Sequence, residues 1–401
     1  MKTVLITAYD INPYKGSEAG TGWRYPLMIS SEYNVIAITR KNNKQNIEKY
    51  ITEHNIDVKR LRFEYYDLPY FLRFWKKGAR GSGIYFYLWQ LFMPIFILKS
   101  QLKADVYHNL NFHADAFPTL LWVFKKPLIW GPINHNERIP KQYVDSSKEK
   151  LKWMAKLFFW NFDPFLWLAK RNSDLILGGN SSVKKRLRID DKKFVAFSQV
   201  GGEKPVRQDK ELGEKSSEVF QILVIGRFIE IKSFDLAIRA FEKFVAKLPD
   251  TANVQLTIIG KGPLEAKLKA QAAATSVHQK IVFIDWLNPQ ELNDFYASSD
   301  VFLFPSHEGA GMVVVEALSF GLPVVCFDNS GPGELVGGHS ALKIKYTNPS
   351  QSVEDYSIAL EKLYSDKNLY NKLSKAAIFR FDEKYNWQQK QKCLLEIYKM
   401  L

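Results

Sequence analysis

Short apolar runs alternate with helix-like runs along nearly the whole chain, and this alternation constrains the fold more than any other feature. It is typical of parallel sheets covered by helices, because parallel strands are buried on both faces and need helical crossovers. The chain therefore belongs to the α/β class. We predict one series of strands at Thr3–Ala8, Asn34–Thr39, Leu61–Tyr66, Asp105–His108, Pro127–Trp130, Asp174–Leu177 and Phe194–Phe197. We predict a second at Val219–Ile225, Val254–Ile259, Ile281–Ile284, Val301–Phe304, Pro323–Phe327 and Ala341–Ile344.

A charged stretch that begins with Gly201-Gly202-Glu203-Lys204-Pro205 separates the two series and is typical of an interdomain linker. At 401 residues the chain is long enough for two domains, each with its own core. We expect two Rossmann-like domains with parallel sheets, the first over residues 1–200 and the second over residues 218–380. Residues 201–217 would form the linker, and residues 381–401 a closing helix.

The positive charge of the chain is confined to its first half. Residues 1–200 contain 32 Lys and Arg against 17 Asp and Glu, whereas residues 201–401 contain 24 against 25. The first half also holds two segments in which aromatic and basic residues are mixed, at residues 70–103 and 148–171. We expect this half to contact an anionic membrane surface. The alternative is that these aromatic side chains pack on the sheet. No recognisable nucleic-acid-binding module is present, and we expect no nucleic-acid partner.

Cysteine content and hydropathy indicate a cytoplasmic protein. The two cysteines, Cys326 and Cys393, are far apart in the sequence, which suggests a reducing compartment without a disulfide framework. The first residues lack the long apolar core of a signal peptide. The most apolar window, Ile84–Leu98, is too short to span a bilayer. We therefore expect a cytoplasmic protein, with peripheral association at the inner face of the membrane.

The segment Pro305–Leu318 is the first candidate site, because it places small residues and two carboxylates after the apolar run Val301–Phe304. If a helix begins near Gly311, then Glu308 precedes it and Glu316 lies in its second turn. Gly309 and Gly311 keep the start of the helix free of side chains, so its N–H groups can approach an anion. A phosphate with hydroxyl groups on either side is what a nucleotide sugar presents. The alternative is a surface turn with two solvated glutamates.

A second candidate site follows the first strand of the second half, at Gly226-Arg227 and Lys232. Ligands of open parallel sheets bind at the carboxyl ends of the strands, where two cations can neutralise a diphosphate. The alternative is a solvated strand end. A glycine-rich loop, Asn12–Trp23, follows the first strand of the chain, but the spacing of its glycines differs from that of a dinucleotide fingerprint. A flexible loop with a helix cap is the alternative there.

Taken together, these segments resemble the retaining nucleotide-sugar glycosyltransferases of family 4, which have the GT-B fold of two Rossmann-like domains facing across a cleft. The resemblance covers nearly the whole chain, and its matches occur in the family's order. They are Gly16-Ser17-Glu18-Ala19-Gly20, Trp130-Gly131-Pro132, Gly226-Arg227 with Lys232, Ile259-Gly260-Lys261-Gly262-Pro263, Pro305-Ser306, the pair Glu308 and Glu316, and Gly321-Leu322-Pro323-Val324-Val325.

The resemblance implies that the closing helix of residues 381–401 packs back on the first domain, and it implies roles for the matched residues. Arg227 and Lys232 would hold the donor diphosphate and stabilise the charge of the departing phosphate, and Glu308 would contact the donor sugar. Glu316 would bind the ribose hydroxyls. Backbone groups would bind the donor at Gly16, Gly226, Gly309, Gly311, Met312 and Val313. The family also carries a histidine after the fourth strand, for which His108 is the first candidate and His113 the second.

The chain departs from the family pattern at two places. Asp285-Trp286 stands where the family often has glycine near the base pocket, and Asn134-His135 stands where related proteins tend to have glycines. No Asp-x-Asp sequence occurs, and no Cys/His cluster has zinc spacing, so we expect neither a metal nor a cofactor.

The predicted function is that of a retaining, metal-independent glycosyltransferase of the hexosyltransferase type. It would move a sugar from a nucleoside-diphosphate donor on the second domain to a hydroxyl group of an acceptor on the first. The expected acceptor is a lipid-linked glycan or a cell-surface polysaccharide precursor. Two alternatives stay open: a nucleotide-sugar epimerase of the same fold, and a non-catalytic module that binds sugar nucleotides.

Overall fold

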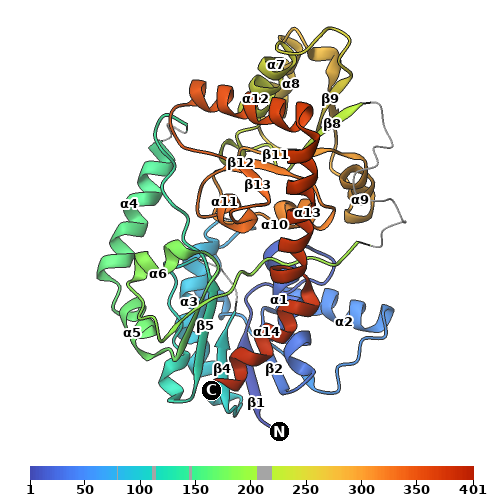
Figure 1. The fold of residues 1–401 in the computed structure, drawn as a ribbon. Helices are drawn as coiled ribbons and strands as arrows, with labels where there is room; N and C mark the ends of the chain where they lie inside the picture. The colour runs from blue at the N-terminus through green and yellow to red at the C-terminus, as the bar shows by residue number, and fades with distance from the viewer. Residues whose placement is uncertain (79, 111–113, 144–146, 206–218) are drawn as a thin grey trace. The chain divides into compact units, whose positions relative to one another are not determined.

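The structure is a computed structural model of the chain, and it describes all residues except 79, 111–113, 144–146 and 206–218 (Figure 1). Contacts within the chain divide it into two compact units. The first unit comprises Met1–His135, Ser147–Val200 and Gln391–Leu401, and the second comprises Asn136–Ser146 and Gly201–Lys390. Most of the predicted linker lies outside the described residues, and the boundaries predicted from the sequence stay predictions.

The first unit is built on a parallel sheet of seven strands in the order β3-β2-β1-β4-β5-β6-β7. All seven lie where the apolar runs predicted them. Their bounds are β1 (Thr3–Thr7), β2 (Asn34–Thr39), β3 (Leu61–Tyr65), β4 (Val106–Asn109), β5 (Leu128–Ile133), β6 (Leu175–Gly178) and β7 (Phe194–Ala196). Its helices are α1 (Ser17–Ser30), α2 (Lys44–Glu53), α3 (Ser82–Lys99), α4 (Ser147–Phe162), α5 (Pro164–Asn172) and α6 (Ser181–Leu187).

The second unit is built on a parallel sheet of six strands in the order β10-β9-β8-β11-β12-β13. The strands are β8 (Phe220–Ile225), β9 (Val254–Ile259), β10 (Ile281–Ile284), β11 (Val301–Phe304), β12 (Val324–Phe327) and β13 (Ala341–Ile344). The helices are α7 (Phe234–Val245), α8 (Glu265–Ala273), α9 (Pro289–Ser298), α10 (Met312–Ser319), α11 (Pro332–Val336), α12 (Pro349–Ser365) and α13 (Lys367–Lys384). Two α/β domains with parallel sheets confirm the predicted fold class.

The last helix, α14 (Trp387–Lys399), joins the first unit from Gln391 onward. The Gln391 Nε2 donates to the backbone carbonyl of Met28 at the end of α1. The ring of Tyr398 lies 5.5 Å from that of Tyr33. The end of the chain therefore packs on the sheet unit that contains its beginning.

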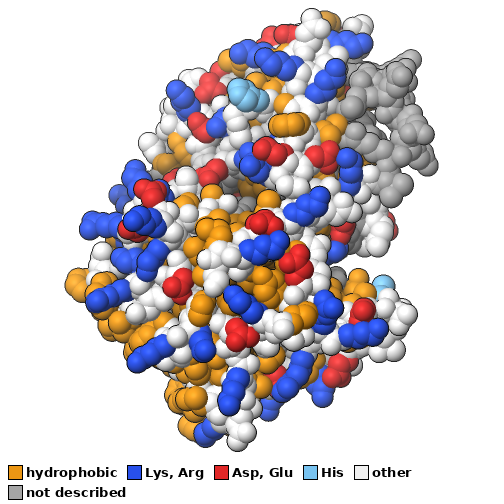
Figure 2. Space-filling model, turned by 60° about the horizontal axis from the view of Figure 1, so that its bottom comes forward, with side chains coloured by type: hydrophobic (Ala, Val, Ile, Leu, Met, Phe, Trp, Pro, Cys, Tyr) orange, Lys and Arg blue, Asp and Glu red, His pale blue; other side chains and the backbone are white. Residues whose placement is uncertain are grey.

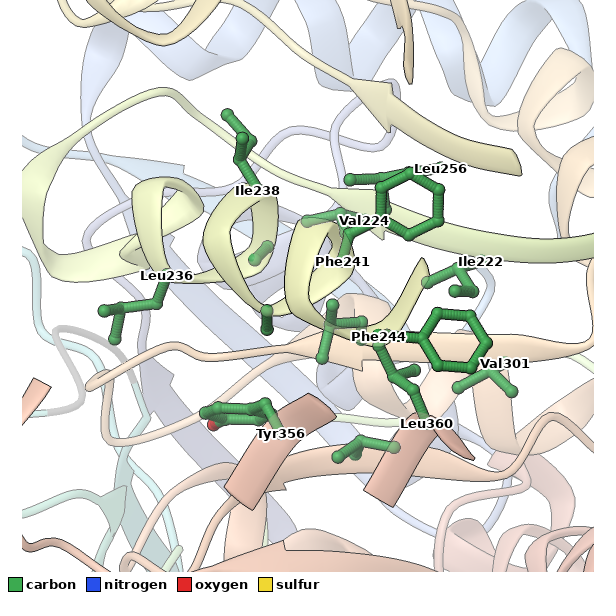
Figure 3. Packing of buried hydrophobic residues seen from close by; sticks show 14 of the residues in the cluster. Ile222, Val224, Leu236, Ile238, Phe241, Phe244, Leu256, Val301, Tyr356 and Leu360 are labelled. Carbon is green, nitrogen blue, oxygen red and sulfur yellow. The ribbon is translucent and has the colours of Figure 1, made fainter. Parts of the chain in front are cut away.

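Helix α7 illustrates how the second core forms. Its apolar residues recur every three or four positions, so one face is buried along its whole length. Figure 3 shows Phe244 of this helix beside Ile222 of β8 and Leu360 of α12, and all three side chains are fully buried. The ring of Phe241 lies beside Leu256 of β9. Burying each such side chain stabilises the fold by about 1.5–3 kcal/mol.

Helix α3 contains the most apolar window of the chain and is largely a core element. Tyr85, Phe86, Trp89, Met93 and Ile97 are buried against the first sheet. For these side chains the packing interpretation of the aromatic segment is the correct one. Among the described residues, no helix combines the length and the apolar character that a membrane crossing needs.

In each sheet the strand order reverses once, and in the second unit this reversal positions the candidate site. From β8 the chain proceeds outward to β9 and β10, and it then returns so that β11 pairs with β8 on the other side. Ligands of open α/β sheets bind at such a switch point, outside the carboxyl ends of the strands.

Candidate functional site

Two loops of the second unit meet at the switch point of its sheet. One follows β8 and contains Gly226–Lys232, and the other follows β11 and contains Pro305–Gly311. The backbone N–H of His307 donates to the carbonyl of Ile231 over 2.9 Å. This bond fixes the two loops against each other and brings Lys232 next to Glu308. From the sequence, these two residues are expected only at the same edge of the sheet.

Lys232 and Glu308 form the charged centre of the site. The Lys232 Nζ lies 2.6 Å from the Glu308 Oε2, and the side chains are only 13% and 21% exposed. The ammonium group also lies 4.6 Å from the centre of the Phe304 ring, at the end of β11. Burial raises the pKa of Glu308, and Lys232 partly offsets this. The pair is therefore held in a poorly solvated place, where charges act strongly on a ligand.

Close backbone approach shapes the loop that carries Glu308. A Cβ atom added to Gly331 would lie 1.9 Å from the Glu308 carbonyl oxygen, so only glycine fits there. Gly226 has a φ of +153°, which L side chains rarely adopt, and it allows the chain to turn directly after β8.

Helix α10 begins as the glycine pattern predicted, with Gly311 as the N-cap and Met312 as its first residue. The N–H groups of Met312 and Val313 belong to the first turn, where helices lack internal acceptors. Gly309 lies in the turn between Glu308 and this helix. Together these backbone groups form an end of a helix suited to a phosphate.

Glu316 lies in the second turn of α10, also as predicted. Its Oε2 accepts a hydrogen bond of 2.8 Å from the hydroxyl of Tyr296 on α9. Burial raises the pKa of Glu316, and this hydrogen bond partly offsets the effect. Among the described residues its other oxygen has no hydrogen-bond partner, which leaves this oxygen for hydroxyl groups of a ligand.

The two cations differ in exposure. Arg227 follows Gly226 at the carboxyl end of β8, and its side chain is exposed. Lys232 ends a 3-10 turn (Glu230–Lys232), and Ser233 separates it from the start of α7. Within the part of the chain that the structure describes, the Arg227 guanidinium has no ion-pair partner, which leaves it free for an anionic ligand.

Other predicted site residues lie in the first unit. The glycine-rich segment predicted as a loop is largely helical, which corrects that prediction: Gly16 is the exposed N-cap of α1, and Gly20 and Gly22 lie within this helix. His108 on β4 is completely buried; its Nδ1 lies 2.6 Å from the Tyr398 hydroxyl and its Nε2 lies 2.6 Å from the Gly131 carbonyl. Burial lowers the pKa of His108 to about 4. Both ring nitrogens are thus engaged within the unit, a geometry that favours a packing role, and its catalytic role stays a prediction. His113 lies outside the described residues.

Some polar side chains of the site were not singled out from the sequence. His307, Asn329 and Tyr346 line a small pocket beside Glu308, with a volume of about 70 Å³, and Glu137 and Arg138 line it from the segment Asn136–Ser146 of the same unit. Asn329 follows β12 and Tyr346 follows β13. Their place after buried parallel strands is a signal that could have identified them. Tyr296, in the middle of a helix, offers no such signal.

An exposed apolar face covers α4 and the start of α5 in the first unit. Leu151, Met154, Phe158 and Phe162 recur at helical spacing and are 51–71% exposed. Trp167 of α5 is 52% exposed, and the guanidinium of Arg171 lies 5.3 Å from its ring centre. On the face of the molecule shown in Figure 2, hydrophobic side chains lie interspersed with Lys and Arg.

Comparison with known proteins matches the second unit to one family. The sequence model of the family described as "Glycosyl transferases group 1" matches residues 206–379. An uncharacterized glycosyltransferase of Haemophilus influenzae is 36% identical over 113 residues, 28% of this chain and 30% of its own length. The GDP-mannose-dependent alpha-(1-6)-phosphatidylinositol monomannoside mannosyltransferase of Mycolicibacterium smegmatis is 32% identical over 123 residues, 29% of this chain and 31% of its own. The chain thus spans about a third of the length of these curated relatives.

The likeness in structure extends over the whole chain. Anabaena Alr3699/HepE, solved in complex with UDP, superposes with a TM-score of 0.65 at 13% sequence identity, and the match covers 100% of both chains. Solved structures of this kind are GT-B glycosyltransferases, and the likeness shows that this chain has their fold. The segment that carries Arg227, Lys232, Glu308 and Glu316 is the segment that the family's sequence model matches.

Proposed function

We propose that the protein is a retaining glycosyltransferase of family 4, which transfers a sugar from a nucleoside-diphosphate donor to a hydroxyl group. The observation that carries this proposal is the buried pair of Lys232 and Glu308 beside the N-terminus of α10. Cationic, anionic and amide groups lie together there at the switch point of a parallel sheet. A diphosphate with sugars at both ends needs this combination.

In the proposed reaction, the bond between the anomeric carbon and the phosphate oxygen breaks while the acceptor oxygen bonds to the same face of that carbon. The acceptor proton passes to the departing phosphate. Lys232 and Arg227 stabilise the negative charge that grows on this phosphate, together with the amides of Met312 and Val313. Such fixed donors act in a water-poor site, and losing one costs on the order of 10²–10³ in rate. Glu316 binds the ribose hydroxyls, and Glu308 contacts the transferred sugar. No metal takes part in this proposal.

The nucleotide and the acceptor are proposed as classes. One relative is named for GDP-mannose and a phosphatidylinositol mannoside, whereas a solved structure of the same fold is described with UDP. We propose a lipid-linked glycan or polysaccharide precursor as the acceptor, reached from the inner face of the membrane. The exposed apolar face of α4 and the basic excess of residues 1–200 support this.

An epimerase of the same fold and a non-catalytic binding module are the competing functions. An epimerase would release an altered sugar nucleotide when incubated with the donor alone. A binding module would have no need of the charged pair, which is costly to bury without a ligand to act on.

Thermal-shift screening against UDP-, GDP-, ADP- and dTDP-sugars tests the proposal, because a ligand of the folded state raises the melting temperature by mass action. A specific donor should raise it in the wild type and lose this effect in Arg227→Ala and Glu316→Ala. Transfer to a membrane extract then separates a transferase from an epimerase. A protein that responds to no sugar nucleotide, or variants that respond like the wild type, would contradict the assignment.

A further inference from the structure

A chain of polar side chains in the second unit ends at the ring of His307, directly before Glu308. It starts at Asn329, whose Oδ1 accepts from the backbone N–H groups of Gly331 and Gly333 over 3.2 and 3.1 Å. Because these two donors fix the orientation of the amide, the Nδ2 must donate. It does so to the Ser306 carbonyl over 3.0 Å and to the Tyr346 hydroxyl over 3.3 Å.

The Tyr346 hydroxyl, oriented by Asn329, in turn determines which nitrogen of the His307 ring accepts a hydrogen bond. It already accepts from Asn329, so its own proton points to the His307 Nδ1, 2.8 Å away. Burial raises the pKa of Tyr346, so the hydroxyl keeps its proton. Burial lowers the pKa of His307 to about 4, so the ring is neutral at pH 7. With Nδ1 as the acceptor, the proton of a neutral ring lies on Nε2.

Aromatic packing holds the ring in place. The His307 ring is stacked on Phe327, with centres 4.9 Å apart, and on Tyr346, and Tyr143 contacts it edge-on at 5.2 Å. Tyr143 is itself tied down, because its hydroxyl lies 2.6 Å from the Ser352 hydroxyl on α12. The direction of the Nε2–H is therefore set by the fold before any ligand arrives.

Two polar atoms at this place lack partners. Within the described part of the chain, the His307 Nε2 and the Glu308 Oε1 are buried and make no hydrogen bond. Leaving such a group unpaired costs about 1–3 kcal/mol, more for a charged one. Only 5% of His307 is exposed, and both residues line the pocket of about 70 Å³ described above. One atom is a donor and the other an acceptor, the pair that a single hydroxyl group satisfies, since it accepts one hydrogen bond and donates one.

We propose that His307 is a specificity-determining residue: its Nε2–H donates to one hydroxyl of the transferred sugar, and the Glu308 Oε1 accepts from the same hydroxyl. This inference rests on the proposed function. It adds His307 to the proposed site and adds the requirement that the transferred sugar carries one particular hydroxyl group. Lys232 holds the other carboxylate oxygen, so Glu308 cannot turn away from the sugar. A sugar that lacks this hydroxyl leaves both atoms unpaired and is rejected.

Calorimetry with two probe sets tests the inference: UDP, UDP-glucose and its four monodeoxy analogues, and GDP, GDP-mannose and the matching analogues. His307→Phe keeps a stacking ring and removes the donor. It should bind the preferred sugar nucleotide about tenfold more weakly, while its affinity for the bare nucleotide stays unchanged. One deoxy analogue should bind the wild type and the variant equally. His307→Gln, whose amide nitrogen can replace Nε2, should recover part of the loss.

The outcomes separate this inference from the function on which it rests. If the wild type binds a sugar nucleotide and His307→Phe binds it equally well, or loses the bare nucleotide to the same extent, the role of His307 is refuted and the proposed function stands. A wild type that binds neither probe set, nor any UDP-, GDP-, ADP- or dTDP-sugar of the thermal-shift panel, refutes both. If His307→Phe does not fold, Tyr346→Phe replaces it, because it leaves His307 in place and removes only the hydroxyl that orients it. It should then show a smaller loss with the same dependence on one sugar hydroxyl.

Discussion

Lys232 and Glu308, which come from two loops far apart in the sequence, lie 2.6 Å apart at the switch point of the second sheet, and water reaches little of either side chain. Removing one member of such a pair leaves the other as an uncompensated charge. The stability of the second unit, which can be measured without a substrate, therefore depends on a pair of residues in the site proposed to bind the donor.

Lys232→Met is expected to lower the free energy of unfolding by about 2–3 kcal/mol, somewhat below the range of about 3–5 kcal/mol for fully buried pairs, because both side chains keep some contact with solvent. The double variant Lys232→Met with Glu308→Gln should recover at least half of this loss, since no charge is then left unpaired. Urea unfolding followed by tryptophan fluorescence measures both. Lys261→Met is the matched control, because its ion pair with Asp285 is more than half exposed and should contribute little to stability. Equal effects of the two single variants would show that the site pair is not coupled in this way.

Glu316 gives a prediction in which stability and binding change in opposite directions. Burial raises its pKa, so keeping the carboxylate charged near neutral pH lowers the stability of the folded protein. Glu316→Gln removes that charge and can still accept from Tyr296. We expect the free energy of unfolding of the ligand-free protein to rise by about 1 kcal/mol, within the range of single stabilising substitutions, and the response to a sugar nucleotide to be lost.

Glu354→Gln is the control for this exchange on the same unit. Two salt bridges, from Lys243 and Lys247, lower the pKa of Glu354 to about 2, so its charge is favoured in the folded state. The Glu354→Gln variant should therefore not melt at a higher temperature than the wild type, and its donor binding should be unchanged. A Glu316→Gln variant that melts below the wild type would mean that its carboxylate is stabilised by the fold.

Buried histidines predict how stability depends on pH. Burial lowers the pKa of both His108 and His307 to about 4, below the ordinary value near 6.5. Between these values the unfolded chain binds more protons than the folded one, so stability falls as the pH decreases from about 6.5 toward 4. Glu308 and Glu316, whose pKa values are raised, act in the opposite direction above about 4.5.

The test compares slopes, so the contribution of the glutamates cancels. The free energy of unfolding of the wild type and of His307→Phe is measured by urea titration at intervals between pH 4 and 7. The wild type should lose roughly 2–3 kcal/mol more than the variant over this range, because the variant has no imidazole to protonate. Parallel curves would show that His307 keeps an ordinary pKa in the folded protein.

The sequence predicts the strands and the helix that carry the site better than the side-chain contacts within it. Every strand could be placed from apolar runs, and the start of α10 from Gly311, because these features depend on local periodicity and backbone freedom. The chain of hydrogen bonds from Asn329 through Tyr346 to His307 could not be placed, since it depends on side-chain conformations after three different strands. The same holds for Tyr296, which reaches Glu316 from another helix. For His108, sequence position alone could not show that Tyr398, near the end of the chain, engages its ring.

The exposed face of α4 leads to the last prediction. Phe158 and Phe162 lie one turn apart on this helix, are 61% and 71% exposed, and their ring centres are 5.4 Å apart. Moving such side chains from water into a bilayer interface is favourable by about 1.5–3 kcal/mol each when burial is complete. Basic residues nearby add attraction to anionic lipid, and salt screens this attraction.

The wild type is therefore expected to float with vesicles that contain phosphatidylglycerol, less so at high salt, and the double variant Phe158→Glu with Phe162→Glu should bind them at least tenfold more weakly. Phe379→Glu is the matched control, because Phe379 is 70% exposed but lies on α13 of the second unit. It should bind like the wild type, since the contact depends on where the aromatic side chains lie and not on their number. Equal flotation of both variants would refute membrane contact through α4 and would favour an acceptor that is not bound to a membrane.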